Sequence, residues 1–254
     1  MLTAVRHPAL KPIRKLLKAM ATRWPYPVGT ELYTKQRIVV DLRSAIGKAI
    51  YVKGQFDLEI GNIIQGILQP GDVFVDVGAN VGSYAIPALL KVEASGIVFA
   101  CEVDPRSLRC LFSSKMRFGY QNLVINGVAI GSRPGVISIL GGGEMAHTYV
   151  LPDGGGHSFP MLPLDAFLPA FGARRVRLIK IDVEGSELDV LKGATALLEA
   201  HKPFILVEVV ATHMARHNYQ PSDLESFLAG VGYSFEPIQG GNDPCWLCSP
   251  MGPA

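Results

Sequence analysis

Two carboxylates lie on either side of a glycine-containing turn in the first half of the chain. Asp76 sits in an apolar run, the turn Gly-Ala-Asn-Val-Gly spans residues 78–82, and Glu102 comes 24 residues after Gly78. Glycine lets the backbone approach a ligand closely. A carboxylate in an apolar strand needs a partner such as an ammonium group, and one at a strand end can accept both ribose hydroxyls. These residues predict a nucleoside site.

The spacing of the glycines bears on which nucleoside would fit. A dinucleotide site has the pattern G-x-G-x-x-G, whereas here Asn80 and Ser83 stand at the second and third glycine positions. A pyrophosphate would therefore fit the turn poorly. S-adenosylmethionine (SAM) carries a carboxylate, an ammonium and a sulfonium but no phosphate, so a looser turn is adequate. We expect SAM as the cofactor; the alternative is a turn that only saves space, with Asp76 as a cap and Glu102 as a surface charge.

A second set of polar residues follows two later apolar runs. Asp182 and Glu184 come after the run 177–181, Glu208 follows the run 204–207, and His213 lies five residues further on. A base beside a nucleophile that must lose its proton speeds a reaction by roughly 10²–10⁴-fold. We predict that Asp182 faces the cofactor or the substrate. Glu184 either does the same or serves the start of the next helix.

His213 is the hypothetical general base, and its alternative is a surface histidine on a loop. His147 and His157, in the glycine-rich segment 141–160, compete for this role if that segment closes over the substrate. The alternative of a metal bound by Asp182, Glu184 and Glu208 is weaker, because no further ligand spacing supports it. We therefore expect no metal.

Cys245 and Cys248 resemble a redox or zinc pair. Residues three apart on a strand point to opposite faces, so neither a disulfide nor joint chelation is expected. The two remaining cysteines, at positions 101 and 110, are predicted to be core residues.

The elements that would position all these residues alternate between strands and helices. Strands are predicted at 73–77, 96–101, 123–125, 136–139, 177–181, 204–207, 233–235 and 245–248, and helices at 58–68, from 85, and after Pro105, Ser186 and Ser222. Capping boxes at Ser186/Asp189 and Ser222/Glu225 predict two of the helix starts. Alternating βα units that end in a hairpin predict a doubly wound, mostly parallel sheet with ligand sites at the carboxyl ends of its strands.

Composition limits the class of protein further. The 254 residues fit one α/β domain at 55–254 behind an N-terminal segment at 1–54. A hydrophobic content of 48% and a charged content of 18% permit a large core, and a net charge of +2 predicts no nucleic-acid partner. Because no apolar run of about 18 residues occurs and four cysteines make no disulfide framework, a cytoplasmic protein is expected.

The first 30 residues hold six basic side chains and no acidic one. Within them, residues 12–20 predict a short basic amphipathic helix. Packing over the cofactor cleft is the favoured role, and contact with an anionic membrane surface or a polyanionic substrate is the alternative.

Three segments resemble the FkbM-type family of class I SAM-dependent methyltransferases. They are residues 73–83, residues 101–105 and the run Lys-Ile-Asp-Val-Glu-Gly-Ser-Glu-Leu-Asp-Val-Leu-Lys-Gly at 180–193, which is the most specific. The resemblance covers roughly residues 55–248 and implies a Rossmann-like, seven-stranded sheet with a C-terminal antiparallel hairpin. It further implies these cofactor contacts: Asp76, Gly78, Asn80 and Gly82 around the methionine part, Glu102 at the ribose, and Asp104, Val128 and Ala129 beside the adenosine.

The better understood members of that family methylate hydroxyl groups on macrolides and sugars. We therefore expect O-methylation of a sugar, a macrolide or another small natural product. N-methylation and a non-catalytic SAM-binding or adaptor protein are the alternatives. Residues 1–50 and 141–160 carry no family signature, which leaves the choice of acceptor open.

Overall fold

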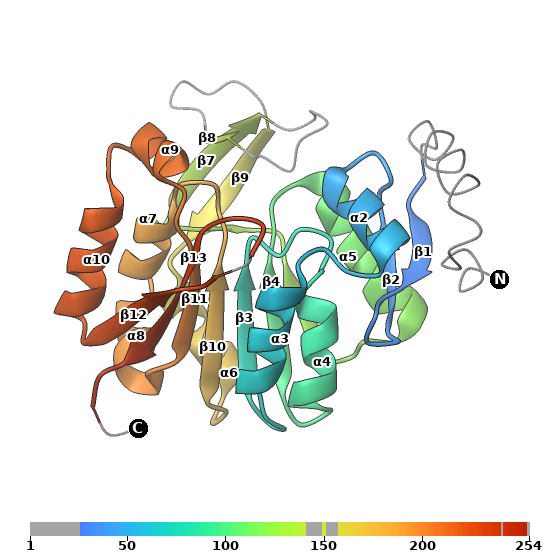
Figure 1. Cartoon of the computed structure of the whole chain (residues 1–254), viewed down its shortest axis with the longest axis horizontal. Helices are drawn as coiled ribbons and strands as arrows, with labels where there is room; N and C mark the ends of the chain where they lie inside the picture. The colour runs from blue at the N-terminus through green and yellow to red at the C-terminus, as the bar shows by residue number, and fades with distance from the viewer. Residues whose placement is uncertain (1–25, 141–148, 151–156, 240, 253–254) are drawn as a thin grey trace.

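The structure is a computed structural model that describes residues 26–140, 149–150, 157–239 and 241–252 (Figure 1). The predicted basic helix at 12–20 and His147 lie outside these residues. A seven-stranded sheet forms the centre, in the order β12-β13-β11-β10-β3-β4-β5. Its strands are β3 (Val73–Val77), β4 (Ile97–Cys101), β5 (Leu123–Asn126), β10 (Val176–Ile181), β11 (Phe204–Glu208), β12 (Tyr233–Pro237) and β13 (Cys245–Pro250).

The predicted doubly wound sheet and its C-terminal hairpin are confirmed. The five strands from β11 to β5 are parallel, and β13 is antiparallel to both β11 and β12. The sheet begins with β3, and the next two strands in the sequence, β4 and β5, lie on one side of it. The following strand of this sheet, β10, lies on the other side of β3. Such a reversal opens a crevice at the carboxyl ends of the strands on either side of it.

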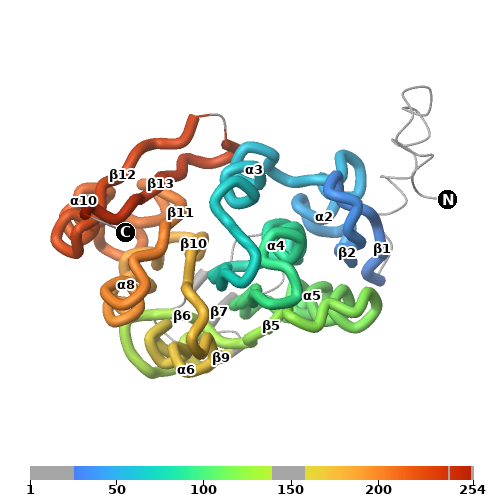
Figure 2. The backbone as a smooth tube through the Cα atoms, turned by 90° about the horizontal axis from the view of Figure 1, so that it is seen from below, coloured from blue at the N-terminus to red at the C-terminus, as the bar shows by residue number. Residues whose placement is uncertain are grey.

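Helices cover both faces of this sheet, as Figure 2 shows with α3 and α4 on one side and α6 and α8 on the other. The helices are α2 (Ala45–Lys53), α3 (Leu58–Ile67), α4 (Ala85–Val92), α5 (Pro105–Phe118), α6 (Leu168–Phe171), α7 (Glu187–Lys192), α8 (Thr195–His201), α9 (Ala211–Met214) and α10 (Pro221–Gly230), with 3₁₀ turns η3 (Leu164–Phe167) and η4 (Ala215–His217).

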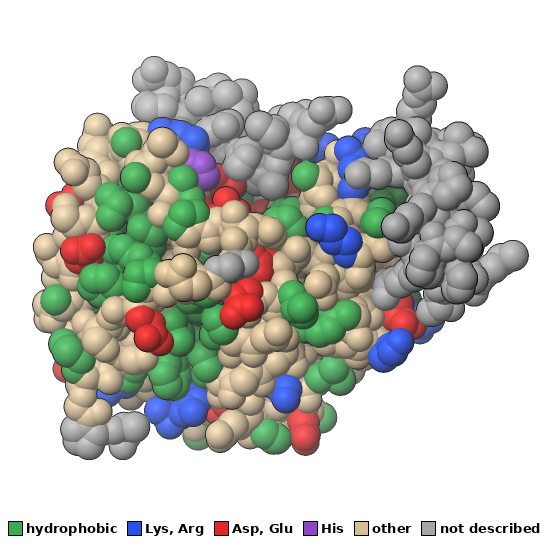
Figure 3. All heavy atoms as spheres, viewed as in Figure 1, with side chains coloured by type: hydrophobic (Ala, Val, Ile, Leu, Met, Phe, Trp, Pro, Cys, Tyr) green, Lys and Arg blue, Asp and Glu red, His purple; other side chains and the backbone are tan. Residues whose placement is uncertain are grey.

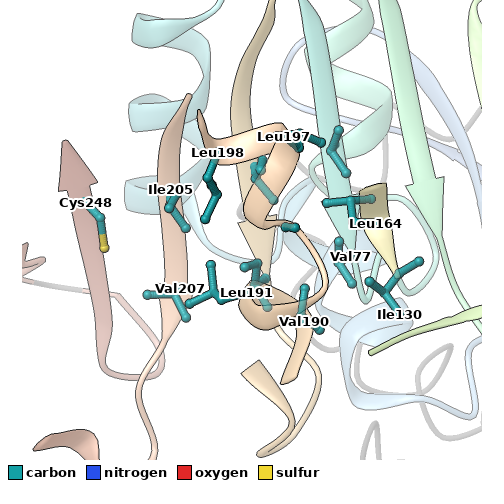
Figure 4. Packing of buried hydrophobic residues seen from close by; sticks show 14 of the residues in the cluster. Val77, Ile130, Leu164, Val190, Leu191, Leu197, Leu198, Ile205, Val207 and Cys248 are labelled. Atoms are coloured by element: carbon teal, nitrogen blue, oxygen red, sulfur yellow. The ribbon is translucent and has the colours of Figure 1, made fainter. Parts of the chain in front are cut away.

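The central strands are buried on both faces, which explains their nearly continuous apolar sequences. In β3, Val75 and Val77 belong to the core cluster beneath α7 and α8, whereas Phe74 belongs to the cluster beneath α3, α4 and α5. Figure 4 shows the first cluster, in which Val77 lies near Val190 and Leu164. Because successive side chains of β3 point to opposite faces of the sheet, this one strand contributes to the core on each face.

A smaller sheet lies beside the main one and was not predicted. It has the order β6-β9-β7-β8, with β6 (Ala129–Ile130), β7 (Gly135–Leu140), β8 (Tyr149–Val150) and β9 (His157–Leu162). Residues 149–150 and 157–160 were expected to belong to an irregular glycine-rich segment. Pairing of β9 with β7, in register from Gly135↔Met161 to Ile139↔His157, makes the later part a strand, although its own sequence has little periodicity.

The described part of the N-terminal segment packs onto the main domain. Strands β1 (Val28–Glu31) and β2 (Arg37–Val40) form a hairpin, and the Val39 N–H donates a 2.8 Å hydrogen bond to the Ser114 hydroxyl of α5. Apolar residues of β2 and α2 share the core cluster of α3 and α4. A domain boundary at residue 54 stays a prediction.

Both predicted capping boxes are wrong. Ser186 precedes α7, but its side chain makes no capping hydrogen bond. Helix α10 begins with Gln220 as its N-cap, two residues before Ser222, and Asp223 accepts the Gln220 N–H at 2.8 Å. Pro221 at the first helical position explains the earlier start, because its fixed φ suits the first turn of a helix.

Acidic and basic side chains are interspersed on the described part of the face in Figure 3, so no large field of one sign forms there. Within the residues that the structure describes, no helix combines the length and the apolar character that crossing a membrane requires.

Candidate active site

The predicted site residues gather where four neighbouring parallel strands end. Asp76 lies in β3, Glu102 directly follows β4, Asp182 directly follows β10, and Glu208 is the last residue of β11. The turn after β3 is fixed to its neighbours, because the Gly78 N–H donates to the Cys101 carbonyl at 3.0 Å. The strand order therefore brings together residues that are up to 132 positions apart in the sequence, from 76 to 208.

The glycines of the turn are required by the packing of the chain itself. Gly78 has a φ of 83°, and a Cβ there would overlap the carbonyl oxygen of Asp182. Gly82 has a φ of 92° and packs against Leu111. Asn80 has a φ of 50°, which asparagine tolerates better than most residues, and its side chain accepts the Val81 N–H at 2.8 Å. The turn is thus a rigid platform at the edge of the crevice.

Glu102 holds together the turn after β3 and the loop after β4. Its Oε2 accepts the Asn80 N–H at 2.6 Å, and its Oε1 accepts the N–H groups of Val103 at 2.6 Å and Asp104 at 2.7 Å. Burial raises the pKa of Glu102 to about 7, although these three donors oppose the rise. A carboxylate has about four accepting positions. One accepting position on Oε2 therefore remains, whereas the predicted contact with both ribose hydroxyls needs two.

The residues assigned to the adenosine have mixed surroundings. The Asp104 side chain is the N-cap of α5 and accepts the Ser107 N–H at 2.9 Å. Ala129 is buried in β6, and Val128, just before it, packs against the core cluster beneath α7 and α8. Their contact with adenosine stays a prediction.

Asn126 is a candidate for this site that the sequence reading missed. It ends β5, its carbonyl accepts the Glu102 N–H at 3.0 Å, and its buried side-chain nitrogen has no hydrogen-bond partner among the described residues. An asparagine that closes an apolar strand is the signal that could have identified it.

Asp76 is fully buried, and the sequence reading missed its neighbour Lys180. The two residues are paired in register across β3 and β10. Burial raises the pKa of Asp76 to about 6, while Lys180 and, more weakly, the Ala85 amide oppose the rise. Neither carboxylate oxygen of Asp76 accepts a well-formed hydrogen bond from a described residue. The carboxylate is therefore partly balanced by Lys180 and still has free accepting positions.

Lys180 also fixes Asp182. Its Nζ lies 2.8 Å from Asp182 Oδ2 and 4.8 Å from the centre of the Tyr84 ring. Burial lowers the pKa of Lys180, but Asp182 and Asp76 together raise it above its ordinary value. The Asp182 side chain remains 34% exposed while it is paired, so that it faces the cofactor or the substrate stays a prediction. A lysine between the apolar residues Ile179 and Ile181 of the strand was the signal for this network.

His213 is not a surface histidine on a loop. It belongs to α9, its side chain is 16% exposed, and its Nδ1 lies 3.1 Å from Glu184 Oε2 and 3.7 Å from Glu208 Oε2. Burial, followed by the negative charge of Asp182, raises the pKa of Glu208 to about 9. One histidine and two carboxylates thus converge from β11, α9 and the turn after β10.

The two glutamates that follow β10 have different roles. Glu187 accepts the Gly185 N–H at 2.9 Å and the Tyr219 hydroxyl at 2.7 Å, and it is buried. It therefore supports the turn at the start of α7. Glu184 is directed toward His213 instead. His157 belongs to β9, and His147 lies outside the described residues.

The expected separation of the two C-terminal cysteines is confirmed. Cys248 belongs to the core cluster beneath α7 and α8, and Cys245 packs against the cluster on the other face. Both are free thiols. They point to opposite faces of β13 and do not form a pair.

Comparison with known proteins agrees with this arrangement. A curated hexuronic acid methyltransferase from Haloferax volcanii is 27% identical over 172 residues, which are 65% of this chain and 64% of that relative. A crystal structure of methyltransferase FkbM from Methylobacillus flagellatus superposes with a TM-score of 0.51 at 17% identity, over 79% of this chain and 52% of the other. At that identity the likeness shows the fold.

The match to a family model is more extensive. The model of the methyltransferase FkbM domain matches residues 76–235, from the buried aspartate of β3 to the hairpin. This span is well over half of the 254 residues. The chain belongs to the FkbM family of methyltransferases.

Proposed function

We propose that this methyltransferase uses SAM and transfers the methyl group to a hydroxyl oxygen of a sugar-type acceptor. The observation that carries the proposal is the position of two groups at one edge of the sheet. Asp76, near the end of β3, and Glu102, directly after β4, lie on one side of the switch in strand order. The cluster of Glu184, Glu208 and His213 lies on the other side. A cofactor and an acceptor would meet between them.

The residues present fit SAM. The free oxygens of Asp76 suit the cofactor's ammonium group, and the remaining position on Glu102 Oε2 suits one ribose hydroxyl. The turn at 78–82 offers no three-glycine cradle for a pyrophosphate. When bound, SAM supplies a methyl group on a positively charged sulfur, and that group is the electrophile.

The protein's own contribution is to orient the acceptor and to remove its proton. Histidine is the residue type that most often accepts a proton in catalysis, and His213 is the histidine of this cluster. Glu184, 3.1 Å from Nδ1, would hold the imidazole in position and stabilise the imidazolium. In this mechanism the acceptor oxygen bonds to the methyl carbon as the carbon–sulfur bond breaks, and the hydroxyl proton passes to His213.

The class of acceptor comes from the curated relative, which acts on a hexuronic acid. This chain spans 64% of that relative's length, so the acceptor is part of the proposal. A sugar acid offers several hydroxyls and one carboxylate as oxygen acceptors.

The test is methyl transfer from methyl-labelled SAM into a panel of free hexuronic acids, their methyl esters, neutral hexoses and amino sugars. NMR of the product would locate the methyl group. We expect the label on a hydroxyl oxygen of a sugar or sugar acid, and the methyl esters should still react because their hydroxyls are intact. Label on an amino nitrogen, or no transfer to any acceptor by a protein that binds SAM, would contradict the proposal.

A further inference from the structure

Three donor atoms from separate parts of the chain converge beside the proposed acceptor site. They are His213 Nδ1, one carboxylate oxygen of Glu184 and one of Glu208, and all three lie within 4.8 Å of one another. Nδ1 is 3.1 Å from the Glu184 oxygen and 3.7 Å from the Glu208 oxygen. Ligands about 2.1 Å from a common metal ion lie roughly 3.0–3.5 Å apart at neighbouring positions and about 4.2 Å apart at opposite ones. Both distances from Nδ1 lie within the range spanned by neighbouring and opposite ligands of one ion.

Glu208 supplies a second indication. The residue is 8% exposed, and its Oε2 lies 3.7 Å from His213 Nδ1, beyond hydrogen-bonding distance. A buried carboxylate is normally paired, hydrogen-bonded or bound to a metal. Lys180, a nearby cation, is held by Asp182 at 2.8 Å. Glu208 is directed toward His213 and therefore into the cluster.

The backbone holds the donors in place before any ligand binds. A Cβ on Gly185 would overlap the carbonyl oxygen of His213, so the turn after β10 and helix α9 are in direct backbone contact there. Glu187 accepts the Gly185 N–H and ties the turn to Tyr219. Metal sites require such supporting contacts, because they fix the orientation of each ligand.

We propose that Glu184, Glu208 and His213 bind a divalent metal ion. Two carboxylates and one imidazole make a mixed oxygen and nitrogen donor set, which suits Mn²⁺ and other first-row divalent ions better than Ca²⁺. Asp182 belongs to the Lys180 pair instead. The donor set therefore differs from the three carboxylates considered from the sequence.

The catalytic consequence rests on the proposed function. An ion in this position would bind the acceptor oxygen and lower the pKa of its hydroxyl, whose proton would pass to solvent water. With Nδ1 bound to the ion, His213 would act as a ligand in place of a base. Both accounts require His213, and they differ in whether a metal is required.

The experiment is a calorimetric titration of Mn²⁺ into the full chain after removal of metals with a chelator. We expect saturable binding of one ion per chain. Glu208→Gln and His213→Asn should each weaken binding by at least about tenfold, because each removes a ligand. Glu225→Gln removes the same charge from an exposed position on α10 and should bind Mn²⁺ like the wild type. Glu184→Gln serves as a further ligand variant if either of the first two does not fold.

Binding is also observable without calorimetry. The electron paramagnetic resonance spectrum of Mn²⁺ should change on addition of the wild-type chain and of Glu225→Gln, but not on addition of Glu208→Gln. Absence of saturable binding of Mn²⁺, Zn²⁺ and Mg²⁺ to the wild type, or equal affinity in the ligand variants, would overturn the inference. If SAM binding and methyl transfer then persist in the presence of chelator, the proposed function stands and His213 remains its base.

Discussion

The Oε2 atom of Glu102 accepts a hydrogen bond from the backbone N–H of Asn80 at 2.6 Å. This contact ties the loop after β4 to the turn after β3. Glu102 thus has a structural role in the protein alone and, in the proposed function, a second role as an acceptor for the ribose. Asn80 makes this contact in a left-handed conformation, with a φ of 50°.

The double role of Glu102 predicts a pH dependence of SAM binding. Burial raises the pKa of Glu102 to about 7. Protonation removes an accepting position and the negative charge, so SAM affinity should fall as the pH is lowered through about 7 and should level off above it. Calorimetry between pH 5.5 and 8.5 would measure this. Glu102→Gln should bind more weakly and lose the transition near pH 7, whereas an unchanged transition would assign the titration to another group.

Replacement of Lys180 should destabilise the protein. Lys180→Met leaves the fully buried Asp76 without the cation opposite it in β10. Removing one partner of a buried ion pair costs on the order of 3 kcal/mol in the free energy of unfolding. Urea denaturation would measure the loss. The double variant Asp76→Asn/Lys180→Met should recover part of it, because no uncompensated charge remains on that pair of strands. A loss no larger than that of a Lys91→Met change at an exposed position of α4 would contradict this account.

Replacement of His213 should separate binding from turnover. His213→Ala removes a side chain that contacts Glu184 and Glu208 but lies across the sheet switch from Asp76 and Glu102. We expect SAM affinity within about twofold of the wild type and a rate of methyl transfer lower by roughly 10²-fold or more. Single-turnover rates with labelled SAM would measure the second quantity. A rate within threefold of the wild type would exclude His213 from the chemistry.

Much of the fold could be predicted because its signals are local. The runs that become β4, β10 and β11 are mostly apolar, as buried parallel strands require, and Glu102, Asp182 and Glu208 stand at their carboxyl ends. The hairpin of β12 and β13 was likewise visible. The β9 strand was not, because its pairing with β7 is a tertiary effect that its own sequence does not encode.

The site was harder to predict than the fold. Sequence spacing placed carboxylates near the crevice but did not show that Lys180 pairs with Asp182, or that Glu187 supports the turn while Glu184 contacts His213. These pairings depend on side-chain directions in a turn where Glu184 has a left-handed φ of 59°. Alternation rules that hold along a strand no longer apply there.

The measurement that tests the central claim most directly is calorimetric titration of SAM into the wild type and Glu102→Ala, with the exposed Glu199→Ala of α8 as the control. Charge-assisted hydrogen bonds contribute about 1.5–3 kcal/mol each, so the loss of Glu102 should weaken SAM binding by roughly 10–100-fold. We expect one SAM per chain for the wild type and for Glu199→Ala, with weakened binding in Glu102→Ala alone. Absence of saturable SAM binding to the wild type, or equal affinity in Glu102→Ala, would contradict the assignment of this edge of the sheet as the cofactor site.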